Sequence, residues 1–347
     1  MIENITLTSF RNHPKKTLNF KKTTIIVGKN TAGKTNILEA VHFLTTGQSF
    51  RAEKDAAVIT YDKDFARIEG VVKDEDEKLK LAIILATQNG RFSKKFTLNS
   101  LPKRRFDFVS NFTSVLFTPL DLEIISASPN IRRKYIDSII KKIDRKFYLT
   151  EKEFEKALKF RNRMLQDIKR EIKFYSANDF EYWDSLLIEQ GQKITQARQN
   201  LVEKINNMPK DIFDFTLLYD KSKISRDRLE KYHDAERAVG QTLVGPTRDD
   251  FIFYFPGSIH EVKEYGSRGE QRLTVLQTKI LEIELVKEAS GQPPTLLLDD
   301  IFSELDEENI EKIYHLIESQ QTIITTTHEE FIPENIRKKE DLEIIHL

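Results

Sequence analysis

The segment 28–35, GKNTAGKT, limits the possible folds of this chain more than any other part of its sequence. It fits the pattern G-x-x-x-x-G-K-[ST] and lies between an apolar run at 23–27 and a stretch of helical spacing at 35–44. A glycine-rich turn between a strand and a helix lets backbone N–H groups and the helix N-terminus surround a phosphate. The sequence therefore predicts an α/β fold with a nucleotide-phosphate site at this turn.

The chemistry of such a site assigns roles to the residues of the loop. We expect Lys34 to bridge the β- and γ-phosphates of a nucleotide and the Thr35 hydroxyl to ligate Mg²⁺. The residues expected to bind the nucleotide are Gly28, Lys29, Asn30, Thr31, Ala32, Gly33, Lys34, Thr35 and Asn36.

A magnesium nucleotide also needs a carboxylate on a neighbouring strand, and the apolar run TLLLDD at 295–300 ends in two of them. We expect Asp299 to hold Mg²⁺ through water, and Asp300 to orient or deprotonate the attacking water. The predicted catalytic residues are therefore Lys34, Asp299 and Asp300, and the predicted metal ligands are Thr35 and Asp299.

The string YGSRGEQRL at 265–273 leads into a long helix and has two interpretations. A serine at a helix start followed three residues later by glutamate is a capping box, which is a purely structural feature. In the other interpretation, Ser267 and the Gly269 N–H form a second anion-binding helix end. A chain with one phosphate loop has use for that second site in a dimer, where each copy completes the nucleotide site of the other.

The charge of the chain is balanced overall and segregated locally. With 55 basic and 55 acidic residues, no excess of positive charge indicates a nucleic-acid partner. Segment 130–170 nevertheless has 14 basic against 6 acidic residues, and segment 281–347 has 5 against 17. A solvated helical face explains the basic segment as well as a polyanion contact does.

Composition excludes several classes of protein. Because the chain has no cysteine, it cannot use disulfides, thiolate zinc sites or a cysteine nucleophile. No apolar run approaches the roughly 20 residues that span a bilayer, and the first residues lack the apolar core of a secretory signal. We therefore expect a cytoplasmic protein that does not enter a membrane.

The order of expected elements suggests one domain interrupted by another. Alternation typical of strands occurs at 5–10, 23–28, 65–72, 79–87, 94–100, 214–219, 251–255, 295–299 and 322–327. Apolar spacing typical of helices dominates 130–210, with an antiparallel pair expected around the polar stretch 176–179, and a further helix is expected from 274. We expect residues 1–125 and 240–347 to form one α/β domain, with 126–239 as a helical arm inserted into it.

The order of these motifs, with the SELD loop at 303–306, resembles the ATP-binding-cassette (ABC) ATPases of the SMC/Rad50 class, and within them the bacterial RecF family. The matching strings are FRN at 10–12, SFR at 49–51, FTP at 117–119, SPNIRRKYID at 128–137 and GPTRDDF at 245–251. This resemblance implies an ABC-type P-loop ATPase head with an antiparallel β subdomain and an inserted helical arm. His328, after the apolar run 322–327, resembles the switch histidine of these ATPases that contacts the γ-phosphate, and otherwise it is a strand-end histidine exposed to water.

The resemblance further implies a function. It implies a weak, DNA-stimulated ATPase that forms a homodimer when ATP and Mg²⁺ are bound, with Arg11 near the adenine and Ser267 at the partner's γ-phosphate. The implied partners are DNA (single-stranded, duplex and their junctions), RecR, and indirectly RecO and RecA, in gap repair, replication restart and the SOS response. The predicted contacts to DNA phosphates are Arg132, Arg133, Lys134, Lys141, Lys142, Arg145 and Lys146.

Three alternatives give different functions for the same phosphate loop. A long coiled-coil protein is excluded because the segment before residue 267 holds only two modest helices. A transporter-type ATPase would dock on a membrane partner and would not need a basic arm. A P-loop kinase or GTPase would use the SRGEQ string only as a helix cap.

Overall fold

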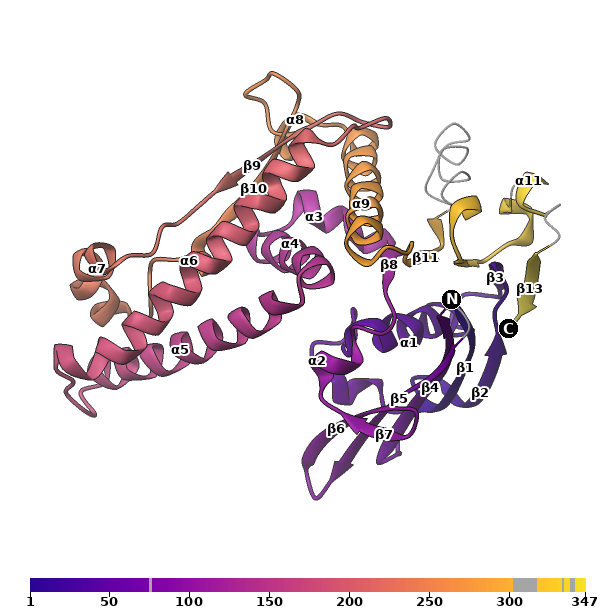
Figure 1. The fold of residues 1–347 in the computed structure, drawn as a ribbon, viewed down its shortest axis with the longest axis horizontal. Helices are drawn as coiled ribbons and strands as arrows, with labels where there is room; N and C mark the ends of the chain where they lie inside the picture. The colour runs from indigo at the N-terminus through magenta and orange to yellow at the C-terminus, as the bar shows by residue number, and fades with distance from the viewer. Residues whose placement is uncertain (75–76, 302–316, 333, 338–340) are drawn as a thin grey trace. The chain divides into compact units, whose positions relative to one another are not determined.

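A computed structural model describes residues 1–74, 77–301, 317–332, 334–337 and 341–347 of the chain (Figure 1). Within these ranges the chain divides into two compact units. Met1–Asp121 with Glu282–Leu347 form the first, which we call the head unit, and Leu122–Leu281 form the second, the arm unit.

A parallel sheet carries the phosphate loop in the head unit. Its strands lie in the order β13 (Leu342–His346), β3 (Thr23–Val27), β12 (Thr322–Thr326), β11 (Thr295–Asp299) and β8 (Ser114–Phe117). Every neighbouring pair is parallel, so the carboxyl ends of β3 and β11 meet at one edge. The sequence pattern predicted the three central strands, which are buried along their whole length, and missed β8 and β13 at the sheet edges.

The second sheet of the head unit is antiparallel. Its order is β2 (His13–Asn19), β1 (Ile2–Phe10), β4 (Phe65–Asp74), β5 (Glu77–Gln88), β6 (Arg91–Leu98) and β7 (Leu101–Lys103). Alternate side chains of β1 and β5 are buried, as expected for a sheet with one covered face. Strand β2 was missed because it buries only His13 and Leu18, which leaves no apolar alternation to detect.

Helix α1 (Lys34–Thr46) packs against both sheets and joins them into one core. It begins directly after the phosphate loop, and most of its apolar side chains are fully buried. The core combines residues of the helix, the parallel sheet and the antiparallel sheet: Ile37, Leu38, Val41, Ile26, Leu297, Ile323, Leu7, Ile68 and Ile83. Movement of the loop at the start of α1 is therefore limited by both sheets.

The arm unit is mainly helical. Its long elements are α4 (Pro129–Ile143), α5 (Arg145–Lys169), α6 (Ala177–Asn207) and α7 (Arg226–Val239). Helices α5 and α6 form the expected pair, but the stretch 176–179 begins α6 instead of linking the two helices. Ser176 and Asp179 bond reciprocally there as a capping box.

Shorter elements complete both units. Helix α9 (Arg268–Ser290) starts in the arm unit, six residues before the expected position 274, and its last residues belong to the head unit. The short helices are α2 (Arg105–Phe108), α3 (Glu123–Ser126), α8 (Val262–Tyr265) and α11 (Glu334–Arg337), with 3-10 turns at Asp55–Val58, Pro119–Leu122, Pro246–Arg248 and Glu329–Phe331. Of the helices in the described ranges, none is both long and apolar enough to cross a membrane.

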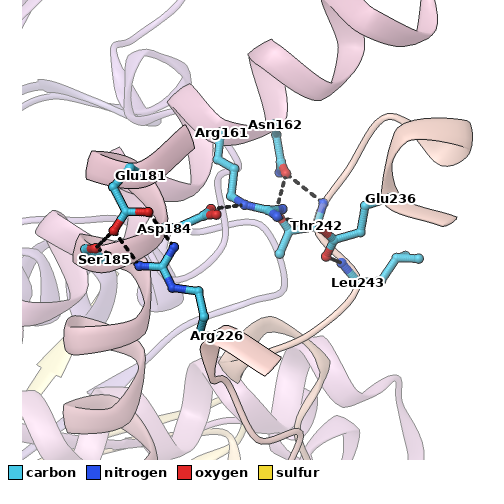
Figure 2. Close-up of polar contacts among 9 residues, drawn as sticks. All are labelled: Arg161, Asn162, Glu181, Asp184, Ser185, Arg226, Glu236, Thr242 and Leu243. Atoms are coloured by element: carbon cyan, nitrogen blue, oxygen red, sulfur yellow. Dashed lines mark hydrogen bonds and ion pairs between the residues drawn. The ribbon is translucent and has the colours of Figure 1, made fainter. Parts of the chain in front are cut away.

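A buried arginine ties helices α5, α6 and α7 together (Figure 2). The Arg161 guanidinium contacts Asp184 at 2.6 Å and Glu236 at 2.7 Å, and donates to the Thr242 hydroxyl at 2.9 Å. The Arg161 and Glu236 side chains are 2% and 0% exposed, so neither charge is solvated by bulk water. Asn162, the next residue, accepts from the Thr242 N–H and hydroxyl. The network fixes the register of the helix pair because each partner comes from a different segment.

A second buried arginine explains why the arm unit is longer than the expected insertion 126–239. Arg198 of α6 makes a bidentate pair with Asp137 of α4 and contacts Asp249 at 2.7 Å. Asp249 also accepts from the Tyr219 hydroxyl and the Ser222 N–H, next to the antiparallel pair β9 (Thr216–Asp220) and β10 (Asp250–Tyr254). Residues 240–281 are therefore part of the arm unit through long-range contacts that a local pattern does not contain.

We expect Asp249→Ala to lower the unfolding free energy of the arm unit by about 3–5 kcal/mol, because it removes a fully buried carboxylate from Arg198. Urea unfolding followed by fluorescence of Trp183, the one tryptophan of the chain, measures this in the arm unit.

Lys193→Ala is the matched control, since it breaks an exposed pair with Glu189 and is expected to cost about 0.5 kcal/mol or less. An equal loss in the two variants would contradict a structural role for Asp249.

Candidate phosphate-binding site

The phosphate loop closes on itself through Lys34. The Lys34 ammonium donates to the carbonyl oxygens of Gly28 at 2.6 Å and Lys29 at 3.1 Å, and the residue is only 7% exposed. Because the loop connects β3 directly to the N-terminus of α1, its N–H groups and the helix dipole act on the same small volume. The ammonium group adds a full positive charge there, which suits a polyphosphate.

A carboxylate of the neighbouring strand lies next to the start of α1. The Thr35 hydroxyl donates to Asp299 Oδ1 at 2.9 Å, and the Thr325 hydroxyl donates to the same oxygen at 2.7 Å. Burial raises the pKa of the Asp299 carboxyl, and the two hydroxyl donors oppose that rise. A hydroxyl and a carboxylate oxygen in contact are hard oxygen donors, so Thr35 and Asp299 fit a Mg²⁺ ion.

Asp300 turns the chain at the end of β11. Its φ is +51°, in the left-handed region, and its N–H donates to the Thr325 carbonyl at 3.1 Å. Outside glycine this conformation is uncommon, although asparagine and aspartate adopt it more readily than other residues. Asp299 and Asp300 therefore both lie at the edge of the sheet that also carries the phosphate loop.

The turn between β1 and β2 supports the loop from the other sheet. The neutral ring of His13, whose pKa is lowered by burial, donates from Nε2 to the Gly33 carbonyl at 3.1 Å. Asn12 donates to the Thr31 carbonyl at 3.3 Å and accepts from the Asn36 amide at 2.8 Å. Gly33 has φ +97°, and a Cβ there would lie 2.5–2.7 Å from Asn12 and His13. The second glycine of the motif is therefore required by its neighbours as well as by its dihedral angle.

Arg11, predicted to lie near the adenine, is held by α1. Its guanidinium makes a bidentate pair with Glu39 at 2.6 and 2.8 Å and also donates to the Ala57 carbonyl at 3.0 Å. Ser49, from the SFR string, donates to the same Glu39 carboxylate at 2.5 Å. The structure places Arg11 beside the helix that follows the phosphate loop, and its contact with adenine stays a prediction.

Ser267 lies in the arm unit, directly before helix α9. Its hydroxyl and N–H both donate to Glu270 at 2.8 Å, and the Glu270 N–H donates back to the hydroxyl at 3.2 Å. The capping box interpretation is thus correct for the isolated chain. A Cβ on Gly269 would meet only the Ser267 hydroxyl, at 3.9 Å, so the space on that side of the glycine is open.

The structure corrects one of the predicted DNA contacts. Arg132 is 6% exposed and makes a bidentate pair with Asp250 at 2.7 and 2.9 Å, so it cannot reach a DNA backbone. Arg133 is half-buried and donates to the Asp249 carbonyl at 2.6 Å, and Lys141 pairs with Glu151. Lys142 is half-buried, whereas Lys134, Arg145 and Lys146 are exposed.

Sequence reasoning missed Asn12, His13, Glu39 and Thr325 as site residues. The FRN string ends at Asn12, so that motif was the available signal for the turn. No local pattern marks Thr325, which reaches Asp299 only because β12 lies beside β11. His328 follows β12 with its side chain 61% exposed, and the predicted SELD loop at 303–306 lies outside the described residues.

The fold and the site together define an ATPase head of the ABC and SMC type. The chain matches the RecF/RecN/SMC N-terminal domain family over residues 1–341. It is 35% identical to the DNA replication and repair protein RecF of Clostridium acetobutylicum and 31% identical to that of Bacillus subtilis, and each alignment covers 94% of this chain and 92% or 93% of the relative. A solved structure of the recombination mediator protein RecF with ATP in the RecFOR pathway has a TM-score of 0.87 and 30% identity, covering 96% of this chain and 93% of that chain.

These findings confirm two of the expectations from sequence. The chain belongs to the RecF family of DNA replication and repair proteins. Its fold class is the expected one, an ABC-type P-loop ATPase head with an antiparallel β subdomain and an inserted helical arm.

We expect Gly33→Ala to weaken binding of a nucleoside triphosphate roughly tenfold or more. An alanine at this φ costs about 1–2 kcal/mol, and its Cβ would push Asn12 and His13 off the loop. Titration with a fluorescent nucleotide analogue measures the loss.

Gly90→Ala is the control, because Gly90 also has a positive φ, at +71°, but its Cβ would meet nothing within 4 Å. Equal nucleotide affinity in wild type and Gly33→Ala would show that the contact with the β1–β2 turn does not shape the site.

Proposed function

We propose that this protein is an ATP-dependent, DNA-binding recombination mediator. The observation that carries the proposal is the contact of Thr35 with Asp299, which joins the phosphate loop to the acidic end of β11. Family membership supports ATP as the nucleotide, since similar solved structures are of RecF with ATP and with an ATP analogue. In this proposal the head unit binds the nucleotide and the arm unit contacts DNA.

The residues of the loop have distinct tasks when ATP binds. Lys34 exchanges the Gly28 and Lys29 carbonyls for phosphate oxygens, and the loop N–H groups then bind the β-phosphate. Thr35 and Asp299 would hold a Mg²⁺ ion, which would supply positive charge to the phosphates. Asp300 orients the attacking water from its turned position after β11. Such a site works by positioning and charge neutralisation, which suits a slow ATPase that acts as a switch.

Two copies of the chain share each nucleotide in this mechanism. Ser267 already donates from its hydroxyl and N–H to a carboxylate oxygen of Glu270, so the same two groups suit a phosphate oxygen. Hydrogen bonds from Ser267 lower the pKa of the Glu270 carboxyl, as expected for a negative charge at the start of a helix. A γ-phosphate from a second copy would take the place of the glutamate.

DNA binding is assigned to exposed cations of α4 and of the first turn of α5. Lys134, Arg145 and Lys146 are exposed, whereas Arg132 is buried and therefore excluded from this role. Contacts of this kind neutralise phosphates without reading sequence, so they suit single strands, duplexes and their junctions. We further propose RecR as a direct partner, RecO and RecA as indirect ones, and a cytoplasmic role in gap repair, replication restart and the SOS response, supported by the RecFOR pathway of a similar structure.

Sedimentation velocity tests the shared site. We expect the wild type to dimerise with ATP and Mg²⁺, and Ser267→Arg to remain monomeric while it still binds ATP, because the bulky side chain blocks only the second copy.

Glu270→Ala separates the two roles of Ser267, since it removes the capping partner and keeps the hydroxyl. If Glu270→Ala is as fully monomeric as Ser267→Arg, Ser267 acts only as a helix cap. A wild type that stays monomeric in excess ATP would contradict the shared-site mechanism.

Salt titration tests the DNA partner. Replacing Lys134, Arg145 and Lys146 by glutamine should reduce the slope of log affinity against log salt concentration by up to about 3 on duplex DNA, because each lost phosphate contact removes about 0.9. Fluorescence anisotropy with and without ATP measures this.

The control is a triple replacement of exposed lysines elsewhere on the arm, Lys193, Lys221 and Lys231, by glutamine. No DNA binding by the wild type at any salt concentration would favour the alternative, a transporter-type or other P-loop ATPase without a DNA role.

A further inference from the structure

Two exposed aromatic rings and one partly buried ring form a cluster on the arm unit that nothing in the proposed function uses. Phe160 of α5 and Trp183 of α6 stack with centroids 4.5 Å apart and an interplanar angle of 7°. Tyr182 meets Trp183 edge-on at 4.9 Å. Phe160 is 41% exposed and Tyr182 63% exposed. Single exposed rings are common on protein surfaces, whereas rings in mutual contact form a contiguous apolar patch, which is typical of a binding surface.

The buried network of Figure 2 holds this cluster in place. Arg161 and Asp184, which pair at 2.6 Å inside the arm, directly follow Phe160 and Trp183 in the sequence. Consecutive residues of a helix point about 100° apart, so a fixed pair on the inner side sets the position of the rings on the outer side. The platform formed by Phe160, Tyr182 and Trp183 is therefore preorganised, and binding would require little ordering of these side chains.

Exposed cations accompany the platform along α5. Lys152, Lys156 and Arg163 are exposed, and with Phe160 they follow the spacing of four, four and three residues that defines one helix face. Along the helix axis, Lys152 and Lys156 are about 6 Å apart and Lys156 and Phe160 again about 6 Å. An aromatic side chain is thus flanked by positive charge in both directions along the same face.

We propose that this face of the arm, Lys152, Lys156, Phe160, Arg163, Tyr182 and Trp183, is a stacking subsite for single-stranded DNA. The proposal rests on the proposed function, because it assumes that the protein binds DNA. Unpaired bases stack on exposed rings while their phosphates contact the flanking cations. Bases of a duplex stack on each other and cannot cover the rings, so the subsite discriminates single strands. An acidic peptide would also satisfy the cations, but it needs apolar side chains of its own to cover the rings, whereas every nucleotide supplies both parts.

The single tryptophan of the chain makes the test direct, because Trp183 belongs to the platform. Titration of the full chain with an oligothymidylate should quench its fluorescence, and a duplex should not. Tyr182→Ala and Phe160→Leu should each weaken oligothymidylate binding by roughly fivefold or more, as expected for loss of base stacking. Phe160→Leu keeps an apolar side chain at this position, so helix packing is preserved while the ring is lost. Duplex affinity should change by less than about twofold in both variants, because duplexes are assigned to the phosphate contacts.

Tyr61→Ala is the matched control, since Tyr61 is an 89% exposed aromatic residue of the head unit. Unchanged oligothymidylate affinity in both platform variants would overturn the subsite and leave the proposed function intact, provided that the wild type binds duplex DNA. A wild type that binds neither form of DNA would overturn both. Quenching by polyglutamate without quenching by oligothymidylate would overturn the subsite in favour of a protein-docking surface.

Discussion

The fully buried carboxylate of Glu39 is the constraint on which the head unit depends. A buried charge without a partner costs several kcal/mol, and Arg11 and Ser49 together provide the partners of Glu39. Arg11 lies in the β1–β2 turn with φ +54°, so the ion pair also fixes the backbone of that turn. The turn and the first residue of β2 then place Asn12 and His13 against the phosphate loop. Helix α1, which follows the phosphate loop, is therefore linked through Glu39 to the antiparallel sheet that supports the loop.

The arm unit is joined by the same kind of interaction. Arg132, Arg161 and Arg198 are each buried, and each pairs with carboxylates from segments distant in sequence. Two of the strings that resemble the RecF family, SPNIRRKYID and GPTRDDF, meet in these pairs: Arg132 with Asp250, and Arg198 with both Asp137 and Asp249. Planar guanidinium groups with bidentate partners fix orientation as well as distance. The contacts of these two strings position the helices of the arm unit.

The sequence predicts the features that local chemistry determines. The phosphate loop, the central strands, the helix pair and the capping serine all follow from short patterns. Contacts between segments were not predictable in this way. Strand β2 buries only His13 and Leu18, so its sequence has no apolar alternation. Thr325 contacts Asp299 only because β12 lies beside β11 in the sheet. Local sequence patterns put the end of the arm near residue 240, because no short pattern indicates that β10 pairs with β9.

The charge of segment 130–170 shows most clearly what a count of residues leaves out. The sequence suggests that its 14 basic residues form one charged surface, but Arg132 and Arg161 are buried and paired with carboxylates. The exposed cations include Lys134 in α4 and Arg145 at the start of α5, and also Lys156 and Arg163 on the α5 face that carries Phe160. Exposed charges act over about 8–10 Å at physiological salt, so a neutral chain can still attract DNA at these places. Under the proposed function, the zero net charge limits attraction elsewhere on the surface and confines DNA binding to these places.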